Sequence, residues 1–439
     1  MRRISLTLLV SLIAVFAAEA KVFTTVSLDI NKETGIYKKG EKIVFTGKLH
    51  EAVDEPLVMT VFENGLEVEK HQVDLTSENT VIYECSYDKA TSIIVQVGIE
   101  SQKKAFTSVG AVVAPEEFTP GFDEPEDFME YWNKQIARLR KSKAKVTMIP
   151  VNSPECEEGY KAYALEISMP EGNPVRGYLA MPENAKKKSL PVVVYTHGAG
   201  VDKPGNRAHV KTAMKHAKMG GGAISLDINA HGFLNDQPEE YYKDLNRGEL
   251  KNYRSRELTT RDEYYFRLMF LRLVRAMDYL CSLQEWDKER VAVIGESQGG
   301  LQAAAIACLD SRVNLSILTC PAHTDLAGTR QGRKSSWPGI YDIAMKSTPD
   351  LIDGILPYFD GANFLRHVQS KVVVEVGLSD LTSPPACVYA GYNVCPSTEK
   401  VIMGVPHRPH SASNIHPDYI KTAKTLGWKK KRILEDFLK

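Results

Sequence analysis

A serine between glycines is the first feature of the sequence with the spacing for chemistry. Residues 295–299 are Gly-Glu-Ser-Gln-Gly, so Ser297 occupies the centre of a Gly-x-Ser-x-Gly motif. Such a motif holds its serine on a sharp turn between a strand and a helix, where the hydroxyl can act as a nucleophile. The β-branched run 291–294 and the alanine-rich run 301–307 supply that strand and helix. The sequence therefore predicts Ser297 as a nucleophile rather than as one more serine of a glycine-rich loop.

A serine nucleophile needs a general base and a carboxylate that orients the base, and hydrolases with this motif carry them in the order Ser, Asp, His. Asp380 follows the apolar run 372–376 and is the predicted acid, with a helix cap or turn residue as the alternative. Two histidines follow the next predicted strand, residues 399–403. His407 is the favoured base because it comes directly after that strand. His410 is the close alternative, because a loop of several residues normally precedes the base.

Acyl transfer also requires two backbone N–H groups that stabilise the oxyanion of the tetrahedral intermediate. The residue after the nucleophile, Gln298, supplies one of them. The loop after the predicted strand 191–195 is Thr-His-Gly-Ala-Gly, and the N–H of Ala199 is the candidate for the other. We expect His197 in this loop to be a buried residue that shapes it, not a second base.

The histidines and cysteines offer little support for a metal site. Zinc binding by His407, His410 and His416 is an alternative use of these side chains, but no carboxylate or thiolate ligand pattern accompanies them. The seven cysteines are dispersed and odd in number, so no disulfide scaffold is expected. Cys387 and Cys395 are close enough in sequence for a bridge, which spacing alone does not establish. We therefore predict no metal and no organic cofactor.

The elements that must position these residues alternate between strands and helices in the second part of the chain. Two predicted strands, 163–167 and 175–180, form an antiparallel pair. Continuous apolar runs, which are typical of strands buried on both faces, follow at 191–195, 222–226, 291–294, 315–318 and 372–376. Predicted helices, such as residues 264–283, separate them. This order predicts an α/β fold with a mostly parallel sheet and helices on both faces.

The N-terminal part of the chain has a different pattern. Arg2 and Arg3, the apolar run 6–16 and the small residues at 18 and 20 predict a signal peptide, residues 1–20, cleaved after Ala20. The run is too short for a membrane anchor, which needs about 20 apolar residues. The protein is therefore expected to be secreted or periplasmic. Short β-branched runs at turn-bounded intervals then predict an all-β sandwich of immunoglobulin-like type.

The predicted domains are the signal peptide at 1–20, the sandwich at 21–114, a Pro- and Glu-rich linker at 115–126 and the α/β domain at 127–439. The role predicted for the sandwich is packing or spacing, with carbohydrate binding as the sharper alternative.

Composition excludes some partners. The 55 Lys and Arg residues balance the 55 Asp and Glu residues, so no overall charge favours nucleic acid. The mature chain has no apolar run that could span a bilayer, so no stable membrane insertion is expected. A homo-oligomer is compatible with the sequence.

The segment from about Phe128 to Leu438 resembles the acetyl-xylan esterase / cephalosporin C deacetylase family of carbohydrate esterases. The resemblance rests on Gly198 in a His-Gly loop, Asp227 within 225–232, the aromatic-basic run 263–267, Trp-Asp-Lys-Glu-Arg at 286–290, Ser-Gln-Gly-Gly at 297–300, and Asp380 followed by Pro384-Pro385 and 389–393. The resemblance implies an α/β-hydrolase fold, serine-based removal of acetyl groups from an acylated carbohydrate, and Ser297, Asp380 and a histidine as the triad.

Three positions depart from the family pattern. Residues 229–232 are Asn-Ala-His-Gly where the family usually has Arg-Gly-Gln-Gly, and Ala199 replaces an aromatic residue after His-Gly. The base is followed by Arg408 or Ser411 where the family usually has Glu. The first two departures concern the substrate pocket, so they affect the expected substrate and oligomer rather than the triad.

Two other functions are compatible with parts of this pattern. A peptidase of the prolyl-oligopeptidase type shares the serine motif and the triad, but its leading domain is usually a propeller that about 90 residues cannot build. A non-catalytic glycan-binding protein on a hydrolase scaffold would use the sandwich instead of the triad. The intact Ser, Asp, His order favours the esterase.

Overall fold

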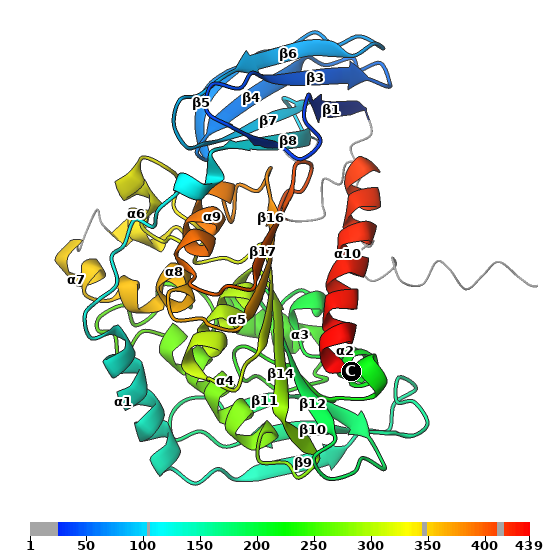
Figure 1. The fold of residues 1–439 in the computed structure, drawn as a ribbon, viewed down its shortest axis with the longest axis vertical. Helices are drawn as coiled ribbons and strands as arrows, with labels where there is room; N and C mark the ends of the chain where they lie inside the picture. Colours follow the sequence, from blue (N-terminus) through cyan, green and yellow to red (C-terminus); the bar gives the residue numbers. More distant parts are fainter. Residues whose placement is uncertain (1–24, 103–105, 345–348, 411–416) are drawn as a thin grey trace, which may run out of the picture. The chain divides into compact units, whose positions relative to one another are not determined.

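The computed structural model of the chain describes residues 25–102, 106–344, 349–410 and 417–439 (Figure 1). The predicted signal peptide at 1–20 lies outside the described residues. The chain divides into two compact units. The first unit comprises Met1–Ala114, Gly377–Leu381 and Gly404–Lys424, and the second comprises Pro115–Val376, Thr382–Met403 and Thr425–Lys439. Within the described ranges, we find no helix with the length and apolarity that crossing a bilayer requires.

The N-terminal part of the first unit is built from strands in two sheets. The strands are β1 (Val26–Ile30), β2 (Ile36–Tyr37), β3 (Ile43–Leu49), β4 (Leu57–Glu63), β5 (Leu66–Gln72), β6 (Thr80–Cys85), β7 (Thr91–Ile99) and β8 (Phe106–Val113). One sheet has the order β1-β3-β6 and the other β2-β8-β7-β4-β5. All pairs are antiparallel except that of β2 with β8. Phe45 of one sheet and Val61 and Val95 of the other are buried in one shared core, as alternating inward positions dictate.

The second part of the chain forms a nine-stranded sheet of order β17-β16-β15-β14-β12-β13-β11-β10-β9. The strands are β9 (Val146–Pro150), β10 (Tyr160–Ile167), β11 (Val175–Pro182), β12 (Leu190–Thr196), β13 (Ile224–Ile228), β14 (Trp286–Glu296), β15 (Leu315–Thr319), β16 (Lys371–Gly377) and β17 (Lys400–Val405). Strands β9, β10, β11 and β13 pair antiparallel in turn, and β13, β12, β14, β15 and β16 pair parallel. The predicted antiparallel β region and mostly parallel α/β sheet are therefore confirmed.

Helices cover this sheet (Figure 1). They are α1 (Phe128–Lys141), α2 (Val210–Ala217), α3 (Glu239–Arg247), α4 (Phe266–Leu280), α5 (Gln298–Leu309), α6 (Ile340–Ala344), α7 (Pro349–Asp353), α8 (Gly361–Leu365), α9 (Pro385–Val394) and α10 (Pro417–Leu438). Leu434 and Leu438 of α10 share a buried cluster with Val193 and Ala292 of the central strands. Helix α5 lies against β14 and β15 and also contacts α4 and α8.

The segment predicted as a linker, 115–126, belongs to the second unit and forms hydrogen bonds within it. Asn393 of α9 donates Nδ2–H groups to the carbonyls of Pro115 at 2.8 Å and Phe118 at 3.0 Å. The N–H of Gly121 donates to Asp325 Oδ1 at 2.6 Å. These hydrogen bonds fix the path of the segment before α1, so it is an ordered part of this unit.

All seven cysteines are free thiols, which answers the question about Cys387 and Cys395. Cys387 Sγ donates to the carbonyl of Lys334 at 3.2 Å, and Cys395 Sγ lies 3.7 Å from the carbonyl of Val368. The two thiols therefore act as small buried side chains with weak hydrogen bonds, and no bridge joins them.

Candidate active site

Ser297 lies on a tight turn between β14 and α5. Its backbone has φ +55° and ψ −121°, a conformation that non-glycine residues rarely adopt. Hydrogen bonds hold the strained turn: Ser297 N donates to Thr319 O at 2.9 Å, and its carbonyl accepts from Ala322 N at 3.0 Å. The flanking glycines are required, because a Cβ on Gly295 would overlap the carbonyl of Gly299. The strand–turn–helix context expected of a nucleophilic serine is thus present.

The loop after β12 runs directly beside this turn. Thr196 Oγ1 lies 2.8 Å from the carbonyl of Gly299, and Gln302 of α5 donates to the carbonyl of His197 at 3.2 Å. A Cβ on Gly299 would overlap the Thr196 carbonyl, so the two backbones approach as closely as glycine allows. The carbonyl of Ala199 accepts a hydrogen bond from Asn206 Nδ2. The loop that carries Ala199 is therefore anchored to the helix that begins with Gln298.

His197 forms a buried ion pair beneath this loop. Its Nε2 contacts Asp227 Oδ1, and its Nδ1 lies 3.1 Å from the carbonyl of Gly205. The second carboxylate oxygen accepts the N–H of His209 at 2.9 Å. Burial alone would lower the pKa of His197, but the charge and hydrogen bond of Asp227 outweigh it and raise this pKa. Both ring nitrogens face acceptors, an arrangement that favours the doubly protonated imidazolium. The expected loop-shaping role fits this geometry.

Asp380 and His410 meet in the first unit. Asp380 follows β16 and is fully buried, and its N–H donates to the carbonyl of Gly377 at 3.2 Å. His410 Nδ1 lies 2.7 Å from Asp380 Oδ2. The ionised carboxylate can only accept, so Nδ1 carries the proton, and the lone pair of a neutral imidazole is then on Nε2. This is the tautomer that a general base of a serine hydrolase requires.

His407 is oriented differently. It follows β17 directly, as expected, but its Nε2 lies 3.0 Å from the carbonyl oxygen of Leu28 in β1. The same nitrogen lies 3.9 Å from Asp29 Oδ1. The ring of His407 is thus directed towards strand β1 and the ring of His410 towards Asp380. Position after a strand, the signal that favoured His407, does not determine where an imidazole points.

The segment that departs from the family pattern forms a buried turn. Asn229 Oδ1 accepts the N–H of Ala208 at 2.8 Å, and its Nδ2 donates to Asn235 Oδ1 at 2.6 Å. His231 Nδ1 lies 2.9 Å from the hydroxyl of Tyr265, while its Nε2 has no hydrogen-bond partner among the described residues. Burial, assisted by the charges of Arg272 and Arg256, lowers the pKa of His231 to about 3. His231 is therefore neutral at physiological pH.

Tyr253 is a residue near the turn that the sequence did not single out. It is buried, its hydroxyl donates to Gln298 Oε1 at 2.5 Å, and its ring contacts His231 edge-on with centroids 4.6 Å apart. It belongs to the irregular segment between α3 and α4, where no periodic pattern points to a buried position. The only sequence signal was its aromatic character in an otherwise charged stretch.

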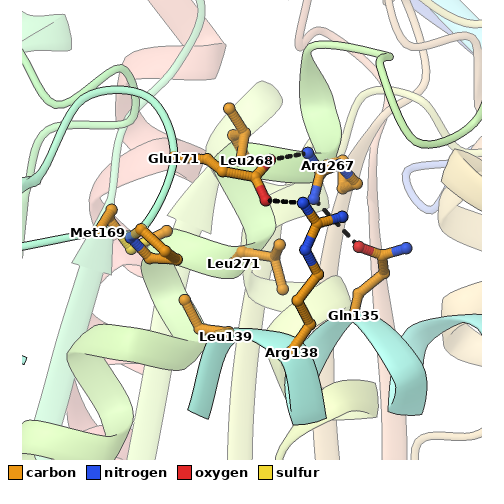
Figure 2. A pocket seen from close by; sticks show the side chains of 9 residues that line it. Gln135, Arg138, Leu139, Met169, Glu171, Arg267, Leu268 and Leu271 are labelled. Atoms are coloured by element: carbon orange, nitrogen blue, oxygen red, sulfur yellow. Dashed lines mark hydrogen bonds and ion pairs between the residues drawn. The ribbon is translucent and has the colours of Figure 1, made fainter. Parts of the chain in front are cut away.

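One small hollow in the second unit is lined by both charged and apolar side chains. Figure 2 shows this hollow between α1 and α4, where Glu171 lies between Arg138 and Arg267. The N–O distances are 2.7 and 2.6 Å, and Arg267 also donates to Gln135 Oε1 at 3.0 Å. The hollow has a volume of about 10 Å³ and can hold at most one water molecule. We interpret this hollow as part of the contact between α1 and α4, which Glu171 bridges through its two ion pairs, and not as a substrate site.

Metal ligands do not gather in the described ranges. No group of three or more His, Cys, Asp or Glu side chains there has the geometry to hold a metal ion. His416, one member of the alternative zinc set, lies outside the described residues.

Three comparisons place the chain among known proteins. A family model described as acetyl xylan esterase (AXE1) matches residues 115–431. The acetyl esterase Axe7A of Xylanibacter ruminicola is 29% identical over 328 residues, which are 74% of this chain and 72% of that protein.

Solved structures agree on the fold. An acetyl xylan esterase from Paenibacillus sp. R4 superimposes with a TM-score of 0.59 and 23% identity, covering 74% of this chain and 98% of that one. Acetyl xylan esterase 1 from Thermoanaerobacterium sp. JW/SL YS485 gives a TM-score of 0.55 and 20% identity, covering 74% and 97%. The family match begins directly after the N-terminal strands and spans most of the remaining chain. The chain therefore belongs to the acetyl xylan esterase family, and it is a carboxylic-ester hydrolase with an α/β-hydrolase fold.

Proposed function

We propose that this enzyme removes acetyl groups from the sugar hydroxyls of a polysaccharide of the xylan type through a covalent acyl-enzyme. Family membership supports the acetyl ester, and the names of the relatives support xylan as the carrier. The observation that carries the mechanism is the 2.7 Å hydrogen bond between His410 and Asp380. It orients one specific imidazole as a base, and Ser297 on its strained turn is the serine that such a base would serve.

The reaction follows from the roles of these groups. His410 Nε2 accepts the proton of the Ser297 hydroxyl while Oγ attacks the acetyl carbonyl. The N–H groups of Gln298 and Ala199 stabilise the tetrahedral oxyanion, and Asp380 stabilises the imidazolium. The imidazolium then protonates the departing sugar oxygen. A water molecule, activated by the same base, attacks the acetyl-enzyme and releases acetate. We choose His410 over His407 because the ring of His407 contacts Leu28.

Replacement of the nucleophile tests this function directly. We expect the variant Ser297→Ala to release acetate from acetylated xylo-oligosaccharides at least about 10⁴-fold more slowly than the wild type. A fluorophosphonate should label the wild type at Ser297, as mass spectrometry of the intact protein would show, and should not label the variant. The control is Ser255→Ala, which removes an exposed hydroxyl that donates to the nearby carbonyl of Asn252 at 3.2 Å.

Substrate choice separates the esterase from its rivals. Cleavage of a prolyl nitroanilide with no acetate release from any ester would overturn the proposal in favour of a peptidase. Glycan binding that persists in Ser297→Ala, with no turnover by the wild type, would show a binding protein.

We also propose that the enzyme is exported. The charged, apolar and small-residue segments of 1–20 support this, and the mature chain should begin at Lys21. N-terminal sequencing of protein collected outside the cytoplasm tests it. A retained Met1 would contradict export by a cleaved signal.

A further inference from the structure

We infer that the N-terminal strands β1 and β8 position the acid and the base of the reaction, so that this β unit is a working part of the esterase. The inference rests on the proposed function, in which Asp380 is the acid and His410 the base. The family match begins at residue 115 and assigns no role to these strands. The loops 377–381 and 404–410 nevertheless belong to the same compact unit as residues 25–114. Contacts within that unit show how the loops are held.

Strand β8 contacts both loops through one glycine. Gly110 N donates to the carbonyl of Pro406 at 2.9 Å. A Cβ on Gly110 would overlap the carbonyl of Leu378, so the β8 backbone lies directly against the loop that leads to Asp380. Because only a glycine permits this approach, the path of both loops depends on β8.

A second set of contacts comes from β1 and the turn before β2. His407 Nε2 lies 3.0 Å from the carbonyl of Leu28 in β1, so this imidazole ties the base loop to the strand. Gly35, with φ +66°, packs so closely that an added Cβ would lie 2.7 Å from the side chain of Leu378 and 2.9 Å from that of Pro406. The unit thus contacts the two loops at Leu378 and at Pro406–His407. These positions are close in sequence to Asp380 and His410.

The loops also fix one another. Leu378 N donates to the carbonyl of Val405 at 2.9 Å, and a Cβ on Gly377 would overlap the carbonyl of Arg408. These contacts join the segment before Asp380 to the segment before His410, whose side chains then meet at 2.7 Å. A displacement at β8 would therefore move the acid and the base relative to the rest of the reaction machinery. Gly110 and His407 are positioning residues in this scheme.

The first test is the full-length variant Gly110→Ala. The added methyl must push the Leu378 carbonyl away, and a misplacement of about 1 Å can lower turnover about 100-fold. We expect kcat on acetylated xylo-oligosaccharides to fall by about this factor while KM stays within about twofold of the wild type. The matched control is Gly47→Ala in β3, whose methyl would lie 2.8 Å from the side chain of Leu75 and 3.4 Å from that of Leu28 inside the same unit, so its nearest neighbours belong to neither loop. It should lower the melting temperature with kcat nearly unchanged.

The second test uses the histidine and its conservative replacement. His407→Ala removes the contact to the Leu28 carbonyl and should lower kcat about three- to tenfold, as the loss of one hydrogen bond implies. His407→Gln offers an amide N–H to the same carbonyl and should restore most of kcat. If Gly110→Ala does not fold, the comparison of His407→Ala with His407→Gln tests the positioning role instead.

The outcomes are distinct from those that test the proposed function. The inference would be overturned if folded Gly110→Ala kept the kcat of the wild type, or if the alanine and glutamine variants of His407 had equal kcat. Neither result would affect the proposed function, which still requires Ser297→Ala to be inactive. An active Ser297→Ala would instead overturn the proposed function. A raised KM at constant kcat in Gly110→Ala would show that the β unit binds the substrate, and the positioning role would be rejected.

Discussion

The structure contains two histidine–aspartate pairs of the same chemistry in different surroundings. In the pair of His197 and Asp227 the side chains are 4% and 0% exposed, and both ring nitrogens face acceptors. In the pair of His410 and Asp380 the histidine side chain is 21% exposed, and the carboxylate contacts Nδ1. The first arrangement holds a fixed positive charge. The second orients a ring that can take up and release a proton at Nε2. Burial and the number of acceptors therefore distinguish the structural histidine, His197, from the histidine that we propose as the base.

The largest expected effect is the loss of turnover when His410 is replaced. His410→Ala should lower kcat for acetate release about 10⁴-fold, because it removes the proposed base. Its melting temperature should change little, because the side chain is partly exposed. His407→Ala is the matched control, and its loss should not exceed about tenfold. If the two variants exchanged these values, the base would be His407, and the contact of His410 with Asp380 would be structural.

The next effect is on the free energy of unfolding, which should depend more on the pair of His197 and Asp227 than on the pair of His410 and Asp380. Asp227→Ala leaves a buried imidazolium without its counter-ion and should lower the free energy of unfolding by about 3–5 kcal/mol. Asp380→Ala should lower it by about 1–2 kcal/mol, because water can reach part of His410. Urea denaturation followed by circular dichroism measures both values. A larger loss for Asp380→Ala would reverse our assignment of the structural pair.

A smaller effect concerns pH. The raised pKa of His197 means that the folded state keeps a proton that the unfolded state releases near pH 6.5. The stabilisation is fully present below about pH 6.5 and is lost as the pH rises through the folded-state pKa. The stability difference between wild type and Asp227→Asn should therefore shrink towards alkaline pH. The neighbouring His216 does not interfere, since burial lowers its pKa to about 3. A constant difference across pH would mean that His197 is neutral.

The smallest effect concerns Tyr253, the tyrosine near the turn that carries Ser297. Tyr253→Phe removes the hydroxyl that donates to Gln298 Oε1 and should lower the free energy of unfolding by about 1 kcal/mol. It should lower kcat less than about fivefold, because the reacting group at Gln298 is its backbone N–H. A loss comparable to that of His410→Ala would place the Tyr253 hydroxyl in the reaction itself.

Much of the fold was predictable because strand burial leaves a local pattern. The apolar runs at 191–195 and 372–376 became β12 and β16 nearly residue for residue. Strand β5 was missed because Leu66–Gln72 is an edge strand whose side chains are all exposed, so it lacks alternation. Strand β8 was also missed, because Thr107, Ser108 and Gly110 interrupt its apolar residues and leave no continuous apolar run along its length.

The site was predictable as a set of residue types but not as a set of contacts. The Gly-x-Ser-x-Gly spacing alone places Ser297 on a turn, because only small neighbours permit that backbone. The choice between His407 and His410 depends on the path of a loop that β1 and β8 hold from more than 290 positions earlier in the chain. The pairing of His197 with Asp227 likewise joins the loop after β12 to strand β13, and no local pattern encodes it.

The seven free thiols have a consequence for where this protein can be made. No covalent cross-link joins its segments, and burial raises the pKa of Cys85 to about 11 and that of Cys281 to about 12, so these thiols hardly ionise at neutral pH. Thiols in this state react slowly with oxidants and with one another. The fold should therefore be indifferent to the redox potential of its surroundings. A bacterial cytosol and an oxidising medium should yield the same active enzyme, and a reductant should leave its melting temperature unchanged.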